Sequence, residues 1–177
     1  MLVSSLGKSC LSRNLENLTQ RIIMAFLFLK EDLDGLNAQI EAEKLKLRET
    51  GKAMGASVAG GETYHDNFAF EDAQRQFGMT SGRVAELNEI RNGANIVSVG
   101  TVDKVSIGRI VTYEDVKTGE KDRIRIGSYR VYVEIPGVDT ASYNTPLARA
   151  LMGGVIGQVR DGIIGGAMKS FRITSIE

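Results

Sequence analysis

The 177-residue chain has one cysteine, one histidine, two prolines and no tryptophan. Cys10 by itself cannot form an internal disulfide or a cysteine-based zinc site, which favours a reducing, cytoplasmic setting. His65 by itself excludes a metal site built from several histidines. The C-terminal half has no Ser-His-Asp or Cys-His set, and no glycine-rich phosphate loop follows a strand in the required order. The sequence therefore does not predict an enzyme that acts on small molecules.

Long hydrophobic runs are also absent. The longest, residues 22–29, has eight residues, whereas a membrane span needs about 20. Lys30-Glu31-Asp32 follows it, where a signal peptide would have small residues for cleavage. Lys and Arg number 22, as do Asp and Glu. This balance excludes a strongly basic surface of the kind that binds nucleic acid, and we expect no membrane contact.

The first segment, residues 1–28, reads as an N-terminal extension. Apolar residues recur at helical spacing between Leu11 and Ile22, so a short amphipathic helix is compatible with it, and a targeting segment is one alternative. Met24 is an alternative start to Met1, because the regular patterns begin after it. The extension need not belong to the native product.

Residues 29–95 carry two helical patterns that favour an antiparallel coiled-coil hairpin. The first pattern is an imperfect heptad seam of apolar residues, namely Leu33, Leu36, Ile40, Leu47 and Met54. The second follows Asp66-Asn67, either of which can cap a helix, and ends at the stop signal Asn92-Gly93. Each helix should have roughly 24 residues and extend on the order of 35 Å.

Four glycines interrupt these helical patterns. Gly35 and Gly51 should weaken the first helix locally. Gly78 and Gly82 in the second helix indicate either close approach of the two helices or simple tolerance of glycine.

The predicted tip of the hairpin, residues 60–67, holds the acids Glu62 and Asp66 in a glycine-rich turn. Carboxylates at a tip can be delivered to a distant metal, although acids are also common at turns and helix starts. Phe68 and Phe70 are aromatic residues beside the tip that either stay exposed or fold back onto the helical seam. For Phe70 we expect core packing.

In residues 96–177 the helical periodicity gives way to short stretches in which apolar and polar residues alternate. This pattern predicts a β-rich domain. Strands are expected at Val105–Val111, Arg123–Ile126, Tyr129–Val133 and Phe171–Ile176, with turns that include 117–120, 135–137, Asp161-Gly162 and Gly165-Gly166.

One short helix is expected within this domain. Thr145 should cap it, Pro146 should occupy its first position and Gly153 should stop it. Leu147 should face the sheet, while Arg149 either neutralises nearby carbonyls or contacts a partner. The whole chain therefore reads as an α+β protein with a helical hairpin followed by a β domain.

This order of parts resembles the Gre family of bacterial transcript cleavage factors over roughly residues 29–177. The family tip has the form Gly-Asp-x-x-Glu-Asn-Ala-x-Tyr, and 61–70 match it with one inserted residue and with the two acid types exchanged. Gly82-Arg83 matches a family Gly-Arg pair, and residues 144–153 resemble the segment Ser-Pro-x-Ala-Arg-x-Leu-x-Gly. The resemblance implies an FKBP-like C-terminal domain.

The resemblance also implies a function as an accessory factor. The C-terminal domain would dock on RNA polymerase through Asn144, Pro146, Leu147 and Arg149, and the hairpin would enter the secondary channel. Glu62 and Asp66 would there help to hold a Mg²⁺ ion shared with the polymerase, which cuts backtracked RNA.

The RNA 3′ end is the other partner that this function implies. Arg48, Lys52 and Arg75 are candidates for contacting it, although each could be an ordinary solvated charge. The protein would bind no cofactor alone and would act as a monomer.

Three rival readings remain open on the sequence. The first is a Gre-like channel binder that inhibits transcription or cleavage, which the exchanged acids and the inserted residue permit. The second is an FKBP-like prolyl isomerase, which would need an apolar, aromatic pocket. The third is a coiled-coil adaptor without a role for the tip.

Overall fold

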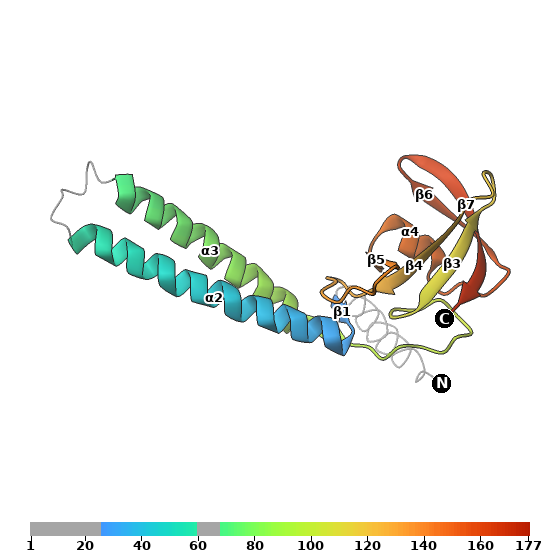
Figure 1. Cartoon of the computed structure of the whole chain (residues 1–177), viewed down its shortest axis with the longest axis horizontal. Helices are drawn as coiled ribbons and strands as arrows, with labels where there is room; N and C mark the ends of the chain where they lie inside the picture. Colours follow the sequence, from blue (N-terminus) through green and yellow to red (C-terminus); the bar gives the residue numbers. More distant parts are fainter. Residues whose placement is uncertain (1–25, 60–67) are drawn as a thin grey trace, which may run out of the picture.

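The computed structural model describes residues 26–59 and 68–177 (Figure 1). Two long helices, α2 (Lys30–Ala59) and α3 (Phe68–Asn92), run antiparallel and project from a β-rich C-terminal domain. They have 30 and 25 residues, so at about 1.5 Å per residue they extend about 45 Å and about 37 Å. The predicted hairpin is confirmed, and α2 is longer than expected.

The ends of the helices next to the C-terminal domain follow local sequence signals. Glu31 and Asp32 lie in the first turn of α2, where negative charge favours the helix dipole. Helix α3 ends at Asn92, and Gly93 follows as the predicted stop. Beyond these ends, β1 (Phe26–Phe28) pairs in parallel with β2 (Ala94–Ile96). Residues 26–28, which the sequence analysis assigned to the N-terminal extension, thus form a strand at the foot of the hairpin.

The two helices pack most tightly near the C-terminal domain. We call the buried residues there the base cluster, which consists of Phe28, Leu36, Ile40, Leu87 and Ile90. Further along, the seam residues Leu47, Met54, Phe70 and Phe77 are only half-buried. The seam predicted for the first helix is correct, but its burial declines away from the base.

The helical glycines differ in their surroundings. A Cβ atom on Gly35 would lie 2.4 Å from Cβ of Tyr132, so a loop of the C-terminal domain presses directly on α2 there. A Cβ on Gly51 would lie 3.5 Å from the Phe77 ring, which is ordinary contact. Around Gly78 and Gly82 no atom lies within 4 Å of that position. Close helix approach at these two glycines is therefore wrong, and glycine is simply tolerated.

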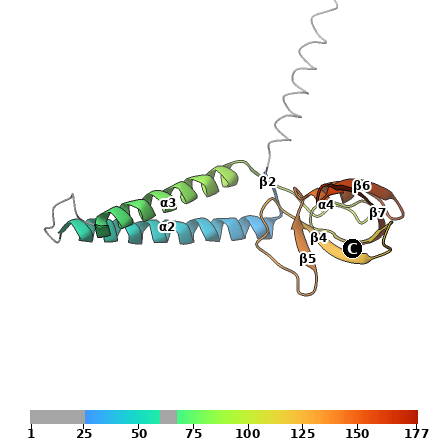
Figure 2. The same ribbon diagram turned by 90° about the horizontal axis from the view of Figure 1, so that it is seen from above.

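The C-terminal domain is built on a five-stranded sheet with the order β5-β4-β3-β7-β6. Figure 2 shows this domain at one end of the hairpin, next to β2. Its strands are β3 (Ile110–Asp115), β4 (Lys121–Gly127), β5 (Asp139–Ser142), β6 (Val159–Ile164) and β7 (Ala167–Ile176). Only the β4–β5 pair is parallel within this sheet. Helix α4 (Pro146–Leu151) buries Ala148 and Leu151 in the same core as Val111, Ile126 and Ile173. This architecture confirms the predicted α+β class.

The strand predictions need three corrections. The stretch predicted from Val105 becomes β-strand only at Ile110, although Val105 itself is buried. Strands β5 and β6 were missed, because β5 is short and polar apart from Ala141 and β6 contains the Asp161-Gly162 pair that we interpreted as a turn. Gly162 is needed within the strand since a Cβ there would lie 2.6 Å from Cβ of Ala150 on α4.

The predicted strand Tyr129–Val133 is a loop. Its amides at Tyr132 and Val133 donate hydrogen bonds to the carboxylate of Asp32 on α2 rather than to a neighbouring strand. Tyr129 and Tyr132 pack against the base cluster, whereas Val133 is exposed, so the apolar alternation in this segment does not reflect sheet pairing.

Candidate functional site

The acids predicted to act, Glu62 and Asp66, lie outside the described residues. Ala59 and Phe68 are the last described residue before them and the first after them, and both lie at the end of the hairpin remote from the C-terminal domain (Figure 1). Their roles as carboxylate ligands of Mg²⁺ remain predictions.

The three basic candidates for RNA contact lie on the hairpin shaft and are exposed. Arg48 and Lys52 are four residues apart on α2, so they share one face of that helix. Arg75 on α3 pairs with Asp72 while its side chain stays 65% exposed. These positions leave all three guanidinium or ammonium groups accessible, and their contact with RNA stays a prediction.

The aromatic residues beside the tip separate into two kinds. Phe70 is half-buried and takes part in contacts within the chain, but it belongs to neither of the two described core clusters, so its core packing stays a prediction. Phe68 is 81% exposed, so it does not fold back onto the helical seam.

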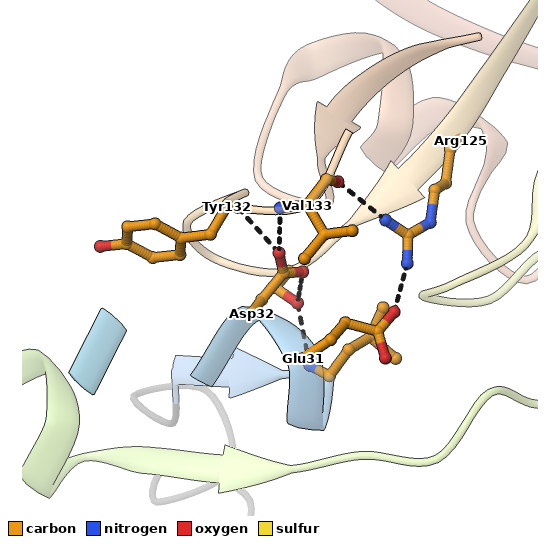
Figure 3. A network of polar contacts seen from close by, with 7 residues as sticks. Glu31, Asp32, Arg125, Tyr132 and Val133 are labelled. Carbon is orange, nitrogen blue, oxygen red and sulfur yellow. Dashed lines mark hydrogen bonds and ion pairs between the residues drawn. The ribbon is translucent and has the colours of Figure 1, made fainter. Parts of the chain in front are cut away.

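A buried polar network fixes the other end of the hairpin (Figure 3). Asp32 is fully buried in the first turn of α2. Its Oδ1 accepts hydrogen bonds from the backbone N–H of Tyr132 (2.8 Å) and of Val133 (3.1 Å), and its Oδ2 accepts one from the Ser128 hydroxyl (2.5 Å). Ser128 Oγ in turn accepts from the N–H of Leu29 (2.8 Å). One carboxylate thus satisfies three donors of the C-terminal domain.

Ion pairs and a phenol hydrogen bond surround this network. Arg125, whose side chain is 5% exposed, donates to Glu31 Oε1 (2.7 Å) and to the carbonyl of Val133 (3.1 Å), as Figure 3 shows. Arg130 binds Glu86 of α3 (2.6 Å). The Tyr132 hydroxyl donates to Gln39 of α2 (2.6 Å), and burial raises the pKa of this phenol. Because both helices are bound to the same loop, the direction of the hairpin is fixed relative to the C-terminal domain.

Sequence reasoning missed this junction. Acids in the first turn of a helix are a recognisable signal, but they are usually solvated. Nothing in the sequence indicated that Asp32 would meet the 128–133 loop, about 100 residues away.

The candidate docking residues lie around the start of α4. Thr145 caps the helix by accepting from the N–H of Ala148 (3.4 Å), and Pro146 occupies its first position, as predicted. Asn144, Pro146 and Arg149 are exposed, whereas Leu147 is half-buried against the core. Asn144, Pro146 and Leu147 thus lie at the start of α4 and Arg149 lies in its last turn, and the binding of these four residues to a partner stays a prediction.

The alternative role for Arg149, neutralising nearby carbonyls, falls to another residue. Arg160 on β6 donates to the carbonyls of Ala150 (3.0 Å) and Met152 (3.2 Å) at the end of α4. The backbone N–H of Arg149 donates to the carbonyl of Thr145 (2.9 Å), but its side chain makes no hydrogen bond or ion pair with another described residue.

Within the described ranges, no group of three or more His, Cys, Asp or Glu side chains could hold a metal ion. None of the helices in these ranges is long and apolar enough to cross a membrane. The pocket formed by 131–140 is lined by Val131, Glu134, Ile135, Pro136, Gly137, Val138, Asp139 and Thr140, and so by no aromatic side chain.

Comparison with known proteins gives a consistent picture. Residues 100–177 match the family described as "Transcription elongation factor, GreA/GreB, C-term". "Transcription inhibitor protein Gfh1" of Thermus aquaticus is 25% identical over 147 residues, which cover 83% of this chain and 93% of that protein. "Transcription elongation factor GreA" of Thioalkalivibrio sulfidiphilus is 29% identical over 150 residues, which cover 77% of this chain and 89% of that protein.

Among solved structures, the crystal structure of GreA factor homolog 1 (Gfh1) of Thermus thermophilus aligns with a TM-score of 0.41 and 23% identity, covering 86% of this chain and 99% of that one. The match of the C-terminal domain and the coverage of the GreA and Gfh1 sequences agree with the order of parts seen in the structure. Residues 100–177 therefore match the GreA/GreB C-terminal family, and the chain as a whole is similar to GreA and Gfh1 proteins.

Proposed function

We propose that this protein binds RNA polymerase through its C-terminal domain, inserts the hairpin into the secondary channel and stimulates cleavage of backtracked RNA. The observation that carries the proposal is the attachment of a hairpin about 40 Å long to the C-terminal domain through the buried contacts of Asp32. A rod can deliver a group to a distant active site only if its foot holds it in one direction. The buried Asp32 network supplies that constraint.

In this proposal Glu62 and Asp66 supply hard carboxylate oxygens, the ligand type that suits Mg²⁺. The ion, shared with the polymerase, stabilises the attacking and leaving oxygens of RNA hydrolysis. The two acids need no unusual pKa for this role, because carboxylates are already charged at neutral pH. The protein is then an accessory factor, and the polymerase performs the cleavage.

Docking in this proposal uses Asn144, Pro146 and Leu147 at the start of α4 and Arg149 in its last turn. Arg149 is available for a partner because Arg160 already neutralises the carbonyls at the end of that helix. The protein acts as a cytoplasmic monomer on the polymerase, with the RNA 3′ end as the second partner. The relatives named as transcription factors are consistent with this assignment.

The test is cleavage of a stalled complex that holds backtracked RNA. Wild type should accelerate release of short 3′ fragments, and Glu62→Ala with Asp66→Ala should abolish the acceleration while binding to the polymerase is retained. The matched control, Glu49→Ala with Glu89→Ala, removes two exposed acids elsewhere on the hairpin and should leave cleavage unchanged. Equal cleavage by the wild type and the tip variant would overturn the proposal and favour the adaptor.

The second candidate function is inhibition of transcription from the same channel. A specific observation favours it, since relatives 25% identical to this chain are named transcription inhibitors. The exchanged acids and the inserted tip residue are compatible with it. Slower elongation with unchanged cleavage would support inhibition, whereas faster fragment release would support stimulation.

Prolyl isomerisation is the least supported function. One pocket of the C-terminal domain, formed by 131–140, has Glu134 and Asp139 in its lining and no aromatic ring. An isomerase site would need an apolar, aromatic surface for the proline ring.

A further inference from the structure

We propose that Phe68 is a stacking platform for a base of the extruded RNA, with Arg75 as its phosphate contact. This inference rests on the proposed function, because it uses the position of the tip near the RNA 3′ end. Phe68 is 81% exposed and is the first residue of α3. Phe68 stands where the family pattern given above has alanine, directly after the shared asparagine.

The geometry of α3 places the aromatic ring of Phe68 and the guanidinium of Arg75 on the same face of the helix. Phe68, Asp72, Arg75 and Met79 follow at steps of four, three and four residues, so they form one stripe of the helix. Phe68 and Arg75 are seven residues apart, or about 10 Å along the axis. The Arg75 side chain stays 65% exposed although Asp72 pairs with it. That pair holds the guanidinium on the stripe and leaves donors free for a phosphate.

Single-stranded RNA is the ligand that suits this combination. An exposed phenylalanine ring offers a face on which any base can stack, and a nearby arginine offers donors to the backbone. The balanced charge of the chain excludes strong binding to RNA in isolation. The platform therefore acts when the polymerase has already brought the RNA end to the tip.

The experiment places 2-aminopurine, whose fluorescence is quenched by stacking, at the 3′ end of the RNA in a backtracked polymerase complex. Wild type should quench it, Phe68→Ala should lose most of the quenching, and Phe68→Trp should retain it. At limiting protein, Phe68→Ala should also lower the rate of cleavage by about tenfold. Met79→Ala is the matched control, because Met79 is an exposed apolar residue on the same stripe further from the tip, and it should leave quenching unchanged.

The outcomes separate this inference from the proposed function. Absence of quenching by bound wild type, or equal quenching by wild type and Phe68→Ala, overturns the platform whatever the cleavage rate. Weaker binding of Phe68→Ala to the polymerase with normal quenching would assign the ring to a protein contact instead, and also overturns it. Quenching that depends on Phe68 without any stimulated cleavage would support the platform and contradict the proposed function.

Discussion

The two ends of the hairpin are built from the same two helices and differ in how they are held. At the base, Leu36, Ile40 and Leu87 are buried, and polar contacts bind both helices to the C-terminal domain. Towards the tip, seam residues such as Leu47 and Phe77 are half-buried, and Phe68 is exposed. Because burial is greatest at the base, we expect the helical hairpin to gain most of its stability there. The remote half keeps exposed groups available for a partner.

The largest expected effect comes from truncating the base cluster. Leu36→Ala should lower the free energy of unfolding by about 3 kcal/mol, because Leu36 is fully buried and its removal leaves a cavity. Leu47→Ala, in the half-buried part of the seam, should lower it by about 1 kcal/mol. Urea unfolding followed by circular dichroism measures both. Equal losses would contradict the concentration of stability at the base.

Removal of the buried carboxylate is next in size. Asp32→Ala leaves the N–H groups of Tyr132 and Val133 and the Ser128 hydroxyl without their acceptor. The expected loss in the free energy of unfolding is about 2 kcal/mol. X-ray scattering should also show a wider distribution of hairpin directions. Asp34→Ala, an exposed acid on the same turn, is the control and should change neither quantity.

Two glycine substitutions should change the stability of the protein in opposite directions. Gly35→Ala places a methyl 2.4 Å from Cβ of Tyr132, so the loop must move and stability should fall by about 1–2 kcal/mol. Gly82→Ala adds a methyl in open space on an exposed helix and should raise stability by about 0.5–1 kcal/mol. Thermal unfolding of both variants gives the comparison. A stabilising Gly35→Ala would show that Tyr132 does not press on α2.

The smallest effect concerns the ion pairs of Glu86. Hydrogen bonding to Arg83, with the charges of Arg83 and Arg130, lowers the pKa of this carboxyl in the folded state. A lowered pKa contributes stability above the ordinary glutamate pKa of about 4.3, and that contribution is lost as the pH falls through the folded value. The urea midpoint of Glu86→Gln should therefore change less than that of wild type between neutral and acidic pH. An identical pH dependence would mean that the pairs contribute nothing.

Local sequence signals predicted the end of α3 and the start of α4 best. Asn92-Gly93 predicted the end of α3, and Thr145-Pro146 predicted the start of α4, because capping depends on neighbouring residues only. The seam at Leu36 and Ile40 was predictable for the same reason, since helical periodicity is local.

The strands and the junction were less predictable. Alternating apolar residues at Tyr129–Val133 indicated a strand, yet the segment pairs with a helix terminus through Asp32. The polar strand β5 has no alternation and forms because β4 offers it an edge. Both outcomes depend on partners distant in the chain, which no local pattern encodes.

The sequence by itself determined the α+β class, the helical hairpin, the cap of α4 and the resemblance to the Gre family, because these depend on local propensity, periodicity and motif. Only the tertiary structure decided which residues fix the hairpin to the C-terminal domain, why Gly35 must be small and that Phe68 stays in solvent. The physical reason is that burial and hydrogen-bond satisfaction of a side chain depend on segments brought together by folding.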